Sequence, residues 1–267
     1  VRRTAAQAEL QALAAFYLEN LLRIKKAFQE DYRQNILSGF LLLRAGGKVE
    51  LITTAATHGY LPLMCTEEAR RAQIGVAVES FARHFGFSPP GFWLPECGYV
   101  SGLEELLKER GLAYFFVDAH CFLYARPQAR CGVYAPVACP NKVAAFARDP
   151  QSSRQVWDRH TGYPGDEYYR EFYRDIGYEL DLDYLKPYLP EGRLRVDTGF
   201  KYYRITGRGP LEEKKPYLPE AARARAAEHA ADFILNRQRQ VLELKKHMRC
   251  PPLVVAPYDA ELFGHWW

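Results

Sequence analysis

The stretch from residue 91 to residue 120, GFWLPECGYVSGLEELLKERGLAYFFVDAH, places a helical pattern between two apolar strand-like runs. The helical part begins at a serine and ends at a glycine, which are common helix boundaries. Another helical pattern precedes it, TEEARRAQIGVAVESFARHFG, with Thr66 as the expected N-cap and Gly86 after its end. Strands joined by helical crossovers pair in parallel. The order therefore predicts an α/β fold built on a parallel sheet covered on both faces.

The same signals predict the remaining elements. Residues 48–64 indicate a buried strand that ends near His58, and residues 193–207 and 252–262 indicate two later strands. Residues 4–44 favour one or two helices, and residues 219–248 a single long helix. The segment 126–195 is rich in Pro, Gly, Tyr and Arg, with few long periodic runs. Such a segment is typical of a functional excursion inserted into an α/β domain.

Polar residues follow three successive predicted strands: His58 after Thr57, then Glu96, then Asp118 with His120. Because the carboxyl ends of parallel strands form the ligand-binding edge of an α/β sheet, we expect this edge to be the working face. The last predicted strand runs into Asp259. Two such carboxylates suit a glycosidase, in which one attacks the sugar and the other protonates the leaving oxygen. For Glu96 alone, a helix N-cap or a salt bridge is an equally good interpretation.

Composition restricts the class of protein further. Hydrophobic residues make up 48% of the chain, and a net charge of +4 is spread among mixed charges, which is not the pattern of a nucleic-acid-binding protein. No apolar run is as long as a membrane span. The six cysteines show neither CxxC pairs nor zinc-ribbon spacing, so we expect buried thiols of a cytoplasmic enzyme and no Cys131–Cys139 disulfide. His120 and Cys121 lack the spacing of zinc ligands, and no metal site is predicted.

Longer motifs carry a resemblance to a known family. The segments WLPECGY (residues 93–99) and YDAELFGHWW (residues 258–267) resemble the third and fourth signature motifs of glycoside hydrolase family 57. They are most similar to those of its 1,4-α-glucan branching enzymes from thermophilic bacteria and archaea. ATHGY (residues 56–60) is similar to the second motif, and residues 162–178 and 198–207 match the branching-enzyme subgroup. The resemblance covers essentially the whole chain.

This resemblance implies an incomplete (β/α)7 barrel, with residues 1–267 as part of one catalytic domain and residues 126–195 as an insertion. Glu96 would be the nucleophile of a retaining mechanism and Asp259 the general acid/base. The glycosyl group would pass to a 6-hydroxyl of glucan or to water. The family's first motif, on the first barrel strand, and its C-terminal helical domain are absent here, so we expect an internal part of a longer protein. The implied enzyme acts in glycogen biosynthesis in the cytoplasm without a cofactor, binds neither nucleic acid nor membrane, and is a monomer or weak oligomer.

Further residues are expected to bind the glucan. They are His58, Trp93, Asp118, Trp157, His265, Trp266 and Trp267. For Asp118 a purely structural hydrogen bond is an equal alternative, and for His58 the alternative is a buried structural histidine. Trp157 is interpreted as a sugar platform on a loop. The alternatives for the whole protein are an α-amylase or 4-α-glucanotransferase of the same family, or, more distantly, a non-catalytic polysaccharide-binding protein on the same scaffold.

Overall fold

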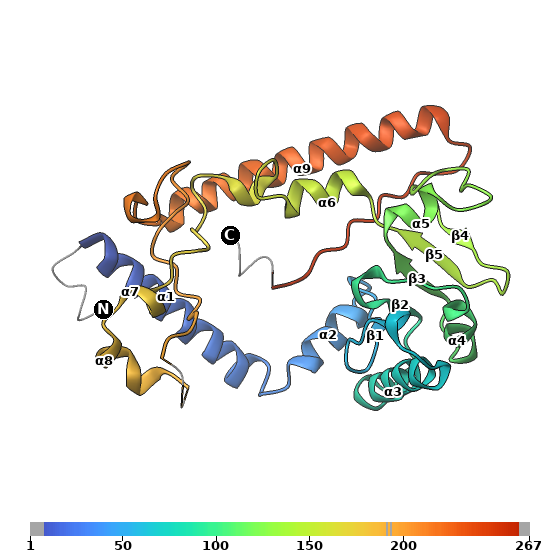
Figure 1. Cartoon of the computed structure of the whole chain (residues 1–267), viewed down its shortest axis with the longest axis horizontal. Helices are drawn as coiled ribbons and strands as arrows, with labels where there is room; N and C mark the ends of the chain where they lie inside the picture. Colours follow the sequence, from blue (N-terminus) through green and yellow to red (C-terminus); the bar gives the residue numbers. More distant parts are fainter. Residues whose placement is uncertain (1–7, 191, 193, 262–267) are drawn as a thin grey trace. The chain divides into compact units, whose positions relative to one another are not determined.

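The computed structural model describes residues 8–190, 192 and 194–261 (Figure 1). The chain forms two compact units. One, called here the sheet unit, consists of residues 27–150 and 238–256. The other, called the helix-loop unit, consists of the described residues of 1–26, 151–237 and 257–267.

A mixed α/β fold with a parallel sheet is confirmed in the sheet unit. The sheet has the strand order β1-β2-β3-β5-β4. Its strands are β1 (Thr53–Thr54), β2 (Gly91–Trp93), β3 (Tyr114–Val117), β4 (Val137–Ala138) and β5 (Ala144–Ala147). The first four strands in this order pair in parallel, and β4 pairs with β5 antiparallel at the edge. The described residues thus form an open sheet of five strands.

Two rows of side chains cross this sheet, one on each face. Phe92 and Phe115 are paired neighbours and at most 1% exposed, so this row lies in the core. On the other face Trp93, Phe116 and Phe146 are in register, with ring centroids 5.8 and 5.9 Å apart. This second row is only partly buried. Phe115 therefore belongs to the core, whereas Phe116 points to the opposite, half-buried face.

Local capping explains the helices of the sheet unit, which are α2 (Ile36–Ala45), α3 (Glu67–Phe85), α4 (Leu103–Glu109) and α5 (Ala119–Leu123). Thr66 accepts a hydrogen bond from the Ala69 amide, and Gly86 ends α3 in the left-handed conformation with φ +79°. Both predicted ends of α3 are confirmed. For α4 the cap is Gly102, with φ +97°, and not the expected serine before it.

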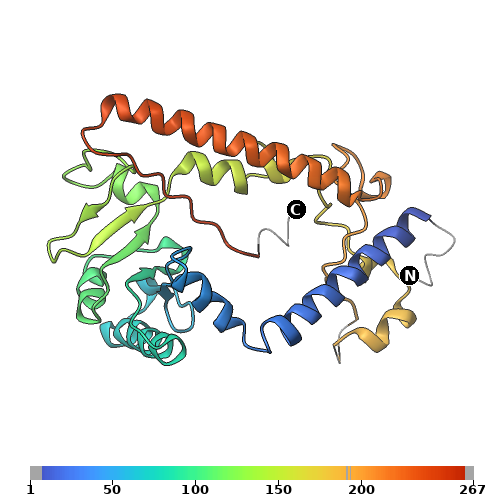
Figure 2. The same ribbon diagram turned by 180° about the vertical axis from the view of Figure 1, so that it is seen from behind.

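The helix-loop unit contains α1 (Ala8–Lys26), all but the first residue of α6 (Pro150–Trp157), α7 (Ile176–Glu179), α8 (Leu182–Leu185) and the first part of α9 (Pro219–His247). A π-helical turn, Ala27–Asp31, separates α1 from α2, so the predicted N-terminal helical region is two helices. The long predicted helix is α9. Figures 1 and 2 both show α6 beside α9, where Arg237 donates to Gln155 Oε1 at 2.9 Å.

Three strand predictions are wrong, wholly or in part. The strand predicted within residues 48–64 is observed only as the two residues of β1. Of the predicted strand 193–207, the described residues 194–207 form only isolated bridges, because the Asp175 carboxylate takes the amides of Thr198 and Gly199 that a sheet would use. The segment 252–261 forms no strand, since its backbone bonds go to two separate partners: Leu253 N to Tyr134 O at 2.9 Å, and Asp149 N to Val255 O at 2.7 Å.

Two strands, β4 and β5, were not predicted. β5 lies inside the segment expected to be a loop-rich excursion, and it pairs with β3 along its whole length. The signal was present as the apolar run from residue 143 to residue 147, directly followed by two charged residues.

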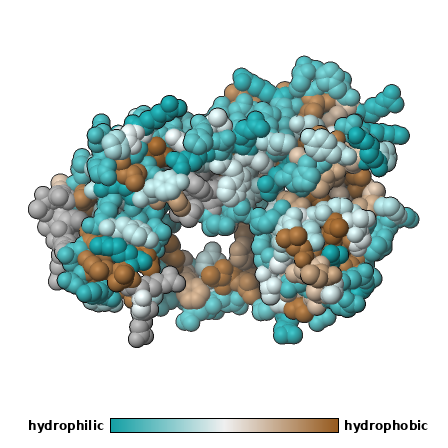
Figure 3. Space-filling view, viewed as in Figure 1, coloured by the Kyte–Doolittle hydropathy of each residue, from teal (hydrophilic) through white to brown (hydrophobic). Residues whose placement is uncertain are grey.

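The face of the molecule seen in Figure 3 is mostly hydrophilic. Among the residues shown there in colour, the hydrophobic ones form separate small patches.

Candidate active site

Four parallel strands of the sheet unit each lead into a polar side chain: β1 into His58, β2 into Glu96, β3 into Asp118 and β5 into Arg148. Parallel pairing places all four at the carboxyl edge of the sheet. Three of these residues were predicted from the sequence, and Arg148 was missed together with β5.

His58 and Glu96 are in contact across the ends of β1 and β2. His58 Nε2 lies 3.4 Å from Glu96 Oε1, and the side chains are 52% and 77% exposed. The other ring nitrogen, Nδ1, lies 3.5 Å from Thr54 Oγ1, and Thr54 donates to the Trp93 carbonyl at 2.8 Å. The imidazole therefore lies between strand β1 and the carboxylate and can orient it. Because the ring is exposed, the interpretation of His58 as a buried histidine is wrong.

The backbone of this site is held in an uncommon conformation. Glu96, Cys97 and His58 have φ values of +54°, +55° and +53°. The left-handed conformation raises the energy of a non-glycine residue by about 1–2 kcal/mol, and residues in this conformation concentrate at functional sites. The Cys97 amide bonds to the Leu94 carbonyl at 2.8 Å and closes the turn. As a result Cys97 is 2% exposed while the neighbouring Glu96 side chain projects into solvent.

Arg148 links the ends of β2, β3 and β5. Its Nη2 lies 3.6 Å from Cys97 Sγ, and its Nε lies 4.0 Å from Asp118 Oδ2. Burial raises the pKa of the Cys97 thiol to about 11, although the Arg148 charge acts in the opposite direction. This thiol stays protonated near neutral pH and does not act as a nucleophile. Arg148 thus supports the turn that carries Glu96.

Asp118 has structural contacts. Its carboxylate caps α5 by accepting from the His120 amide at 3.4 Å, and its Oδ1 lies 3.2 Å from His120 Nδ1. These contacts, with Arg148, give the structural role that the sequence left open. A further contact of Asp118 with a sugar hydroxyl stays a prediction.

Two predicted tryptophans lie in different units. Trp93 ends β2 and is half-buried, three residues before Glu96. Trp157 is the last residue of α6, so its expected place on a loop is wrong. The helix α6 begins at Pro150, a favourable residue in the first turn of a helix.

Asp259 is an exposed residue of the helix-loop unit. The preceding Tyr258 is held by its hydroxyl, which donates to the Ser152 carbonyl at 3.2 Å, and its ring packs on Phe233. Because Glu96 belongs to the sheet unit, the pairing of the two carboxylates stays a prediction. His265, Trp266 and Trp267 lie outside the described residues.

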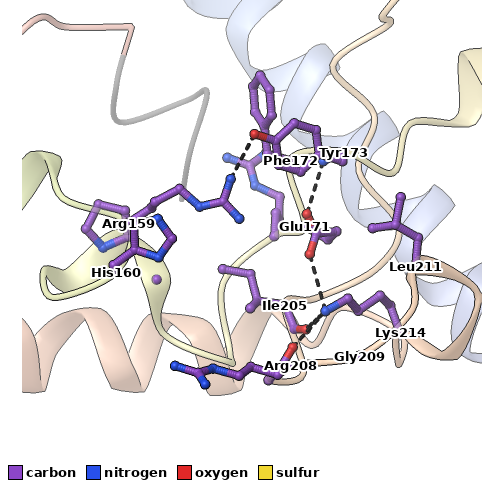
Figure 4. Close-up of a pocket in the computed structure, with 14 residues that line it drawn as sticks. Arg159, His160, Glu171, Phe172, Tyr173, Ile205, Arg208, Gly209, Leu211 and Lys214 are labelled. Carbon is purple, nitrogen blue, oxygen red and sulfur yellow. Dashed lines mark hydrogen bonds and ion pairs between the residues drawn. The ribbon is translucent and has the colours of Figure 1, made fainter.

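The helix-loop unit contains a cavity of about 490 Å³. Figure 4 shows charged and aromatic side chains around it, including Arg159, Glu171, Tyr173, Arg208 and Lys214. Arg159 donates to the Tyr173 hydroxyl at 2.8 Å, and Lys214 lies 3.6 Å from Glu171 Oε2. Guanidinium, carboxylate and an exposed aromatic ring together can bind a ligand that carries several hydroxyl groups. None of the predicted site residues described by the structure lines this cavity.

Two other properties concern the described part of the chain. No group of three or more His, Cys, Asp or Glu side chains there could hold a metal ion. No described helix is both long and apolar enough to cross a membrane.

An exposed carboxylate at the carboxyl edge of a parallel α/β sheet is an arrangement that fits a glycoside hydrolase. The model of glycosyl hydrolase family 57 matches residues 15–266. The chain is a member of that family.

Curated relatives in the family are described as branching enzymes. A 1,4-alpha-glucan branching enzyme from Thermococcus kodakarensis is 36% identical over 95% of this chain and 39% of its own length. A probable 1,4-alpha-glucan branching enzyme from Mycobacterium tuberculosis is 31% identical over 96% of this chain and 45% of its own length. The chain therefore spans less than half the length of these relatives.

Solved structures of the family have the same fold. The alpha-amylase AmyC from Thermotoga maritima is 44% identical, has a TM-score of 0.92, and is matched over 100% of this chain and 52% of its own. A family 57 branching enzyme from Pyrococcus horikoshii is 33% identical, with a TM-score of 0.82 over 98% of this chain and 47% of its own.

Proposed function

We propose that the full-length protein is a retaining α-glucan glycosyltransferase that cleaves α-1,4-glucan and transfers the chain to a 6-hydroxyl, as a glycogen-branching enzyme does. The observation that carries the proposal is the exposed carboxylate of Glu96, which projects from the catalytic edge of the sheet beside His58. The curated relatives are described as branching enzymes, and this supports branching over the other reactions considered for the family.

The proposed reaction has two displacements at one carbon. Glu96 attacks the anomeric carbon and forms a covalent glycosyl-enzyme, while Asp259 gives its proton to the departing oxygen. Asp259 then takes a proton from the acceptor hydroxyl, whose oxygen displaces Glu96. Two inversions retain the α configuration. This requires the carboxyl groups to lie about 5–5.5 Å apart in the assembled enzyme.

The remaining assignments belong to the same proposal. The incomplete (β/α)7 barrel of the family is the expected scaffold. Trp93 and Trp157 are assigned to glucan binding with the three C-terminal residues His265, Trp266 and Trp267. Amylose and glycogen are the proposed substrates of a cytoplasmic monomer or weak oligomer.

An α-amylase is the second candidate, because AmyC is 44% identical to this chain over its whole length. Hydrolysis and branching share the glycosyl-enzyme and differ only in the acceptor. Hydrolysis creates one new reducing end per bond cleaved, whereas transfer to another glucan leaves the number of reducing ends unchanged. The two activities are therefore distinguishable from products alone.

Incubation of amylose with the full-length protein tests the proposal. We expect new α-1,6 linkages, measured by proton NMR or debranching, at a nearly constant number of reducing ends. Rising reducing ends without α-1,6 linkages would identify the amylase. Redistributed α-1,4 chain lengths without either change would identify a 4-α-glucanotransferase.

Replacing His58 by alanine should lower kcat and leave KM nearly unchanged. A hydrogen bond to a charged group contributes about 1.5–3 kcal/mol, which corresponds to roughly 10-fold to 100-fold in rate. The measurement is the rate of amylose conversion as a function of substrate concentration. His84→Ala is the matched control, since His84 is an exposed histidine of α3 whose Nδ1 bonds to the Ser80 carbonyl of its own helix at 2.8 Å. A raised KM at unchanged kcat would show instead that His58 binds sugar without orienting Glu96.

A further inference from the structure

Two cysteine thiols far apart in the sequence meet in the sheet unit. Cys131 Sγ and Cys250 Sγ are 3.8 Å apart and 119 positions apart in the chain. Both residues belong to the sheet unit, so their contact is defined within one compact body. Cys250 is exposed and Cys131 is half-buried. The prediction that most cysteines are buried is wrong. Of the six, all of them described by the structure, Cys97 alone is buried, and the others are half-buried or exposed.

The contact joins a loop of the sheet unit to the segment that continues along the chain toward Asp259. Cys131 lies in the loop after α5, and Cys250 begins the segment that runs from the end of α9 toward residue 257. Figures 1 and 2 both show this segment passing next to that loop. Leu253 N donates to Tyr134 O at 2.9 Å, so one backbone bond already connects the segment and the loop three residues beyond each cysteine.

We propose that Cys131 and Cys250 form a reversible redox pair, which a small disulfide such as oxidised glutathione converts to a protein disulfide. The thiolate of exposed Cys250 attacks one sulfur of the small disulfide, forming a mixed disulfide and releasing one thiol. The Cys131 thiolate then attacks Cys250 Sγ and releases the second thiol. The protein loses two electrons and two protons, and the small disulfide is reduced to two thiols.

The geometry favours this pair over the other cysteines. The two sulfur atoms need to approach by about 1.8 Å to reach the bond length of a disulfide, and both are accessible from solvent. Cys121 and Cys139, in contrast, line a small apolar cavity of about 150 Å³ with Phe115 and Val117. Burial raises the pKa values of both of those thiols. They therefore react slowly with a charged oxidant.

The expected consequence is stabilisation. A disulfide across a long loop restricts the unfolded chain, and here it would enclose 119 sequence positions. We expect a rise in Tm of about 5–10 °C on oxidation. The bond would also fasten the start of the segment that leads to Asp259. Only this last consequence rests on the proposed function, because disulfide formation and Tm do not depend on the reaction catalysed.

The test treats the full-length protein with oxidised glutathione at mildly alkaline pH. The pH is chosen because the hydrogen bond with the Cys250 thiol raises the pKa of Cys131. Peptide mapping without reductant should find the Cys131 and Cys250 peptides joined, with the loss of two hydrogen atoms. The Tm should rise, and dithiothreitol should reverse both changes. Cys131→Ser and Cys250→Ser should each abolish the rise.

Cys65→Ser is the matched control, since Cys65 is also exposed, and it should behave as the unmodified protein. Glutathione that stays attached to Cys250 while Cys131 remains free would overturn the proposal. A cross-linked product with an unchanged Tm would overturn the stabilising role. Neither result would bear on the proposed glucan cleavage. That proposal fails separately, if the Glu96→Ala variant remains active.

Discussion

Replacing Glu96 by alanine in the full-length protein should lower kcat on amylose by at least about 10⁴-fold. Without the carboxylate no glycosyl-enzyme forms, and His58, which contacts it at 3.4 Å, has no group to orient. The measurement is product formation from amylose under single-turnover conditions. Residual activity within about tenfold of the unmodified enzyme would remove Glu96 from the role of nucleophile.

Azide separates the roles of the two carboxylates. With an activated donor, Glu96→Ala should give the inverted glycosyl azide, because azide attacks in place of the missing nucleophile. Asp259→Ala should still glycosylate Glu96 and give the azide of retained configuration. The opposite pair of products would reverse the two assignments.

The backbone at residue 96 supplies a control for unfolding. Glu96→Gly and Glu96→Ala both remove the carboxylate, but only glycine adopts φ +54° without strain. The glycine variant should be inactive and yet about 1 kcal/mol more stable than the alanine variant. Equal stabilities in thermal unfolding would mean that the turn relaxes and that its conformation is not imposed by the surrounding structure.

Replacing Asp175 by asparagine should open the loops of the helix-loop unit. Asp175 and Lys201 have side chains only 1% and 8% exposed, and they lie 3.1 Å apart. The carboxylate also accepts hydrogen bonds from Gly177 N at 2.8 Å, Thr198 N at 3.0 Å, Thr198 Oγ1 at 2.7 Å and Gly199 N at 2.9 Å. Removing one member of a buried ion pair costs about 3–5 kcal/mol, since it leaves a buried charge uncompensated.

Hydrogen exchange at the amides of Gly177, Thr198 and Gly199 measures this effect. Protection should fall by about a hundredfold or more in Asp175→Asn. Asp183→Asn is the control, because Asp183 forms an exposed pair with Lys186 and its replacement should leave these amides unchanged. Equal protection in both variants would show that Asp175 does not hold the loops.

The same carboxylate predicts a dependence on pH. Burial raises the pKa of Asp175, but hydrogen bonds from Thr198, Gly177 and Lys201 outweigh burial and hold that pKa below its ordinary value. A carboxyl group with a lowered folded pKa stabilises the protein above its unfolded pKa, about 3.9. That contribution is lost as pH falls through the folded pKa. The acid-side loss of protection should therefore be smaller in Asp175→Asn than in the unmodified protein.

Sequence patterns predicted the helices of the chain better than its strands. Both ends of α3 were identified from Thr66 and Gly86, because a cap involves residues only three or four positions apart. The missed strand β5 lies in a run of five small or apolar residues, 143–147, inside a segment rich in turn signals. The apolar pattern of residues 252–261 predicts a strand. Strand formation also requires a continuous partner, and a single sequence does not show whether one exists.

The sequence by itself determined three properties. They are the family, the parallel pairing of β2 and β3 through the helix α4, and the place of Glu96 just after a strand. These properties depend on motifs and on short-range patterns of polarity and capping. Only the tertiary structure decided that His58 contacts Glu96, that Arg148 supports Cys97 and Asp118, and that Cys131 meets Cys250 across 119 positions. The physical reason is that such contacts depend on sheet register and on positive-φ turns, which bring distant side chains together through packing of the whole sheet unit.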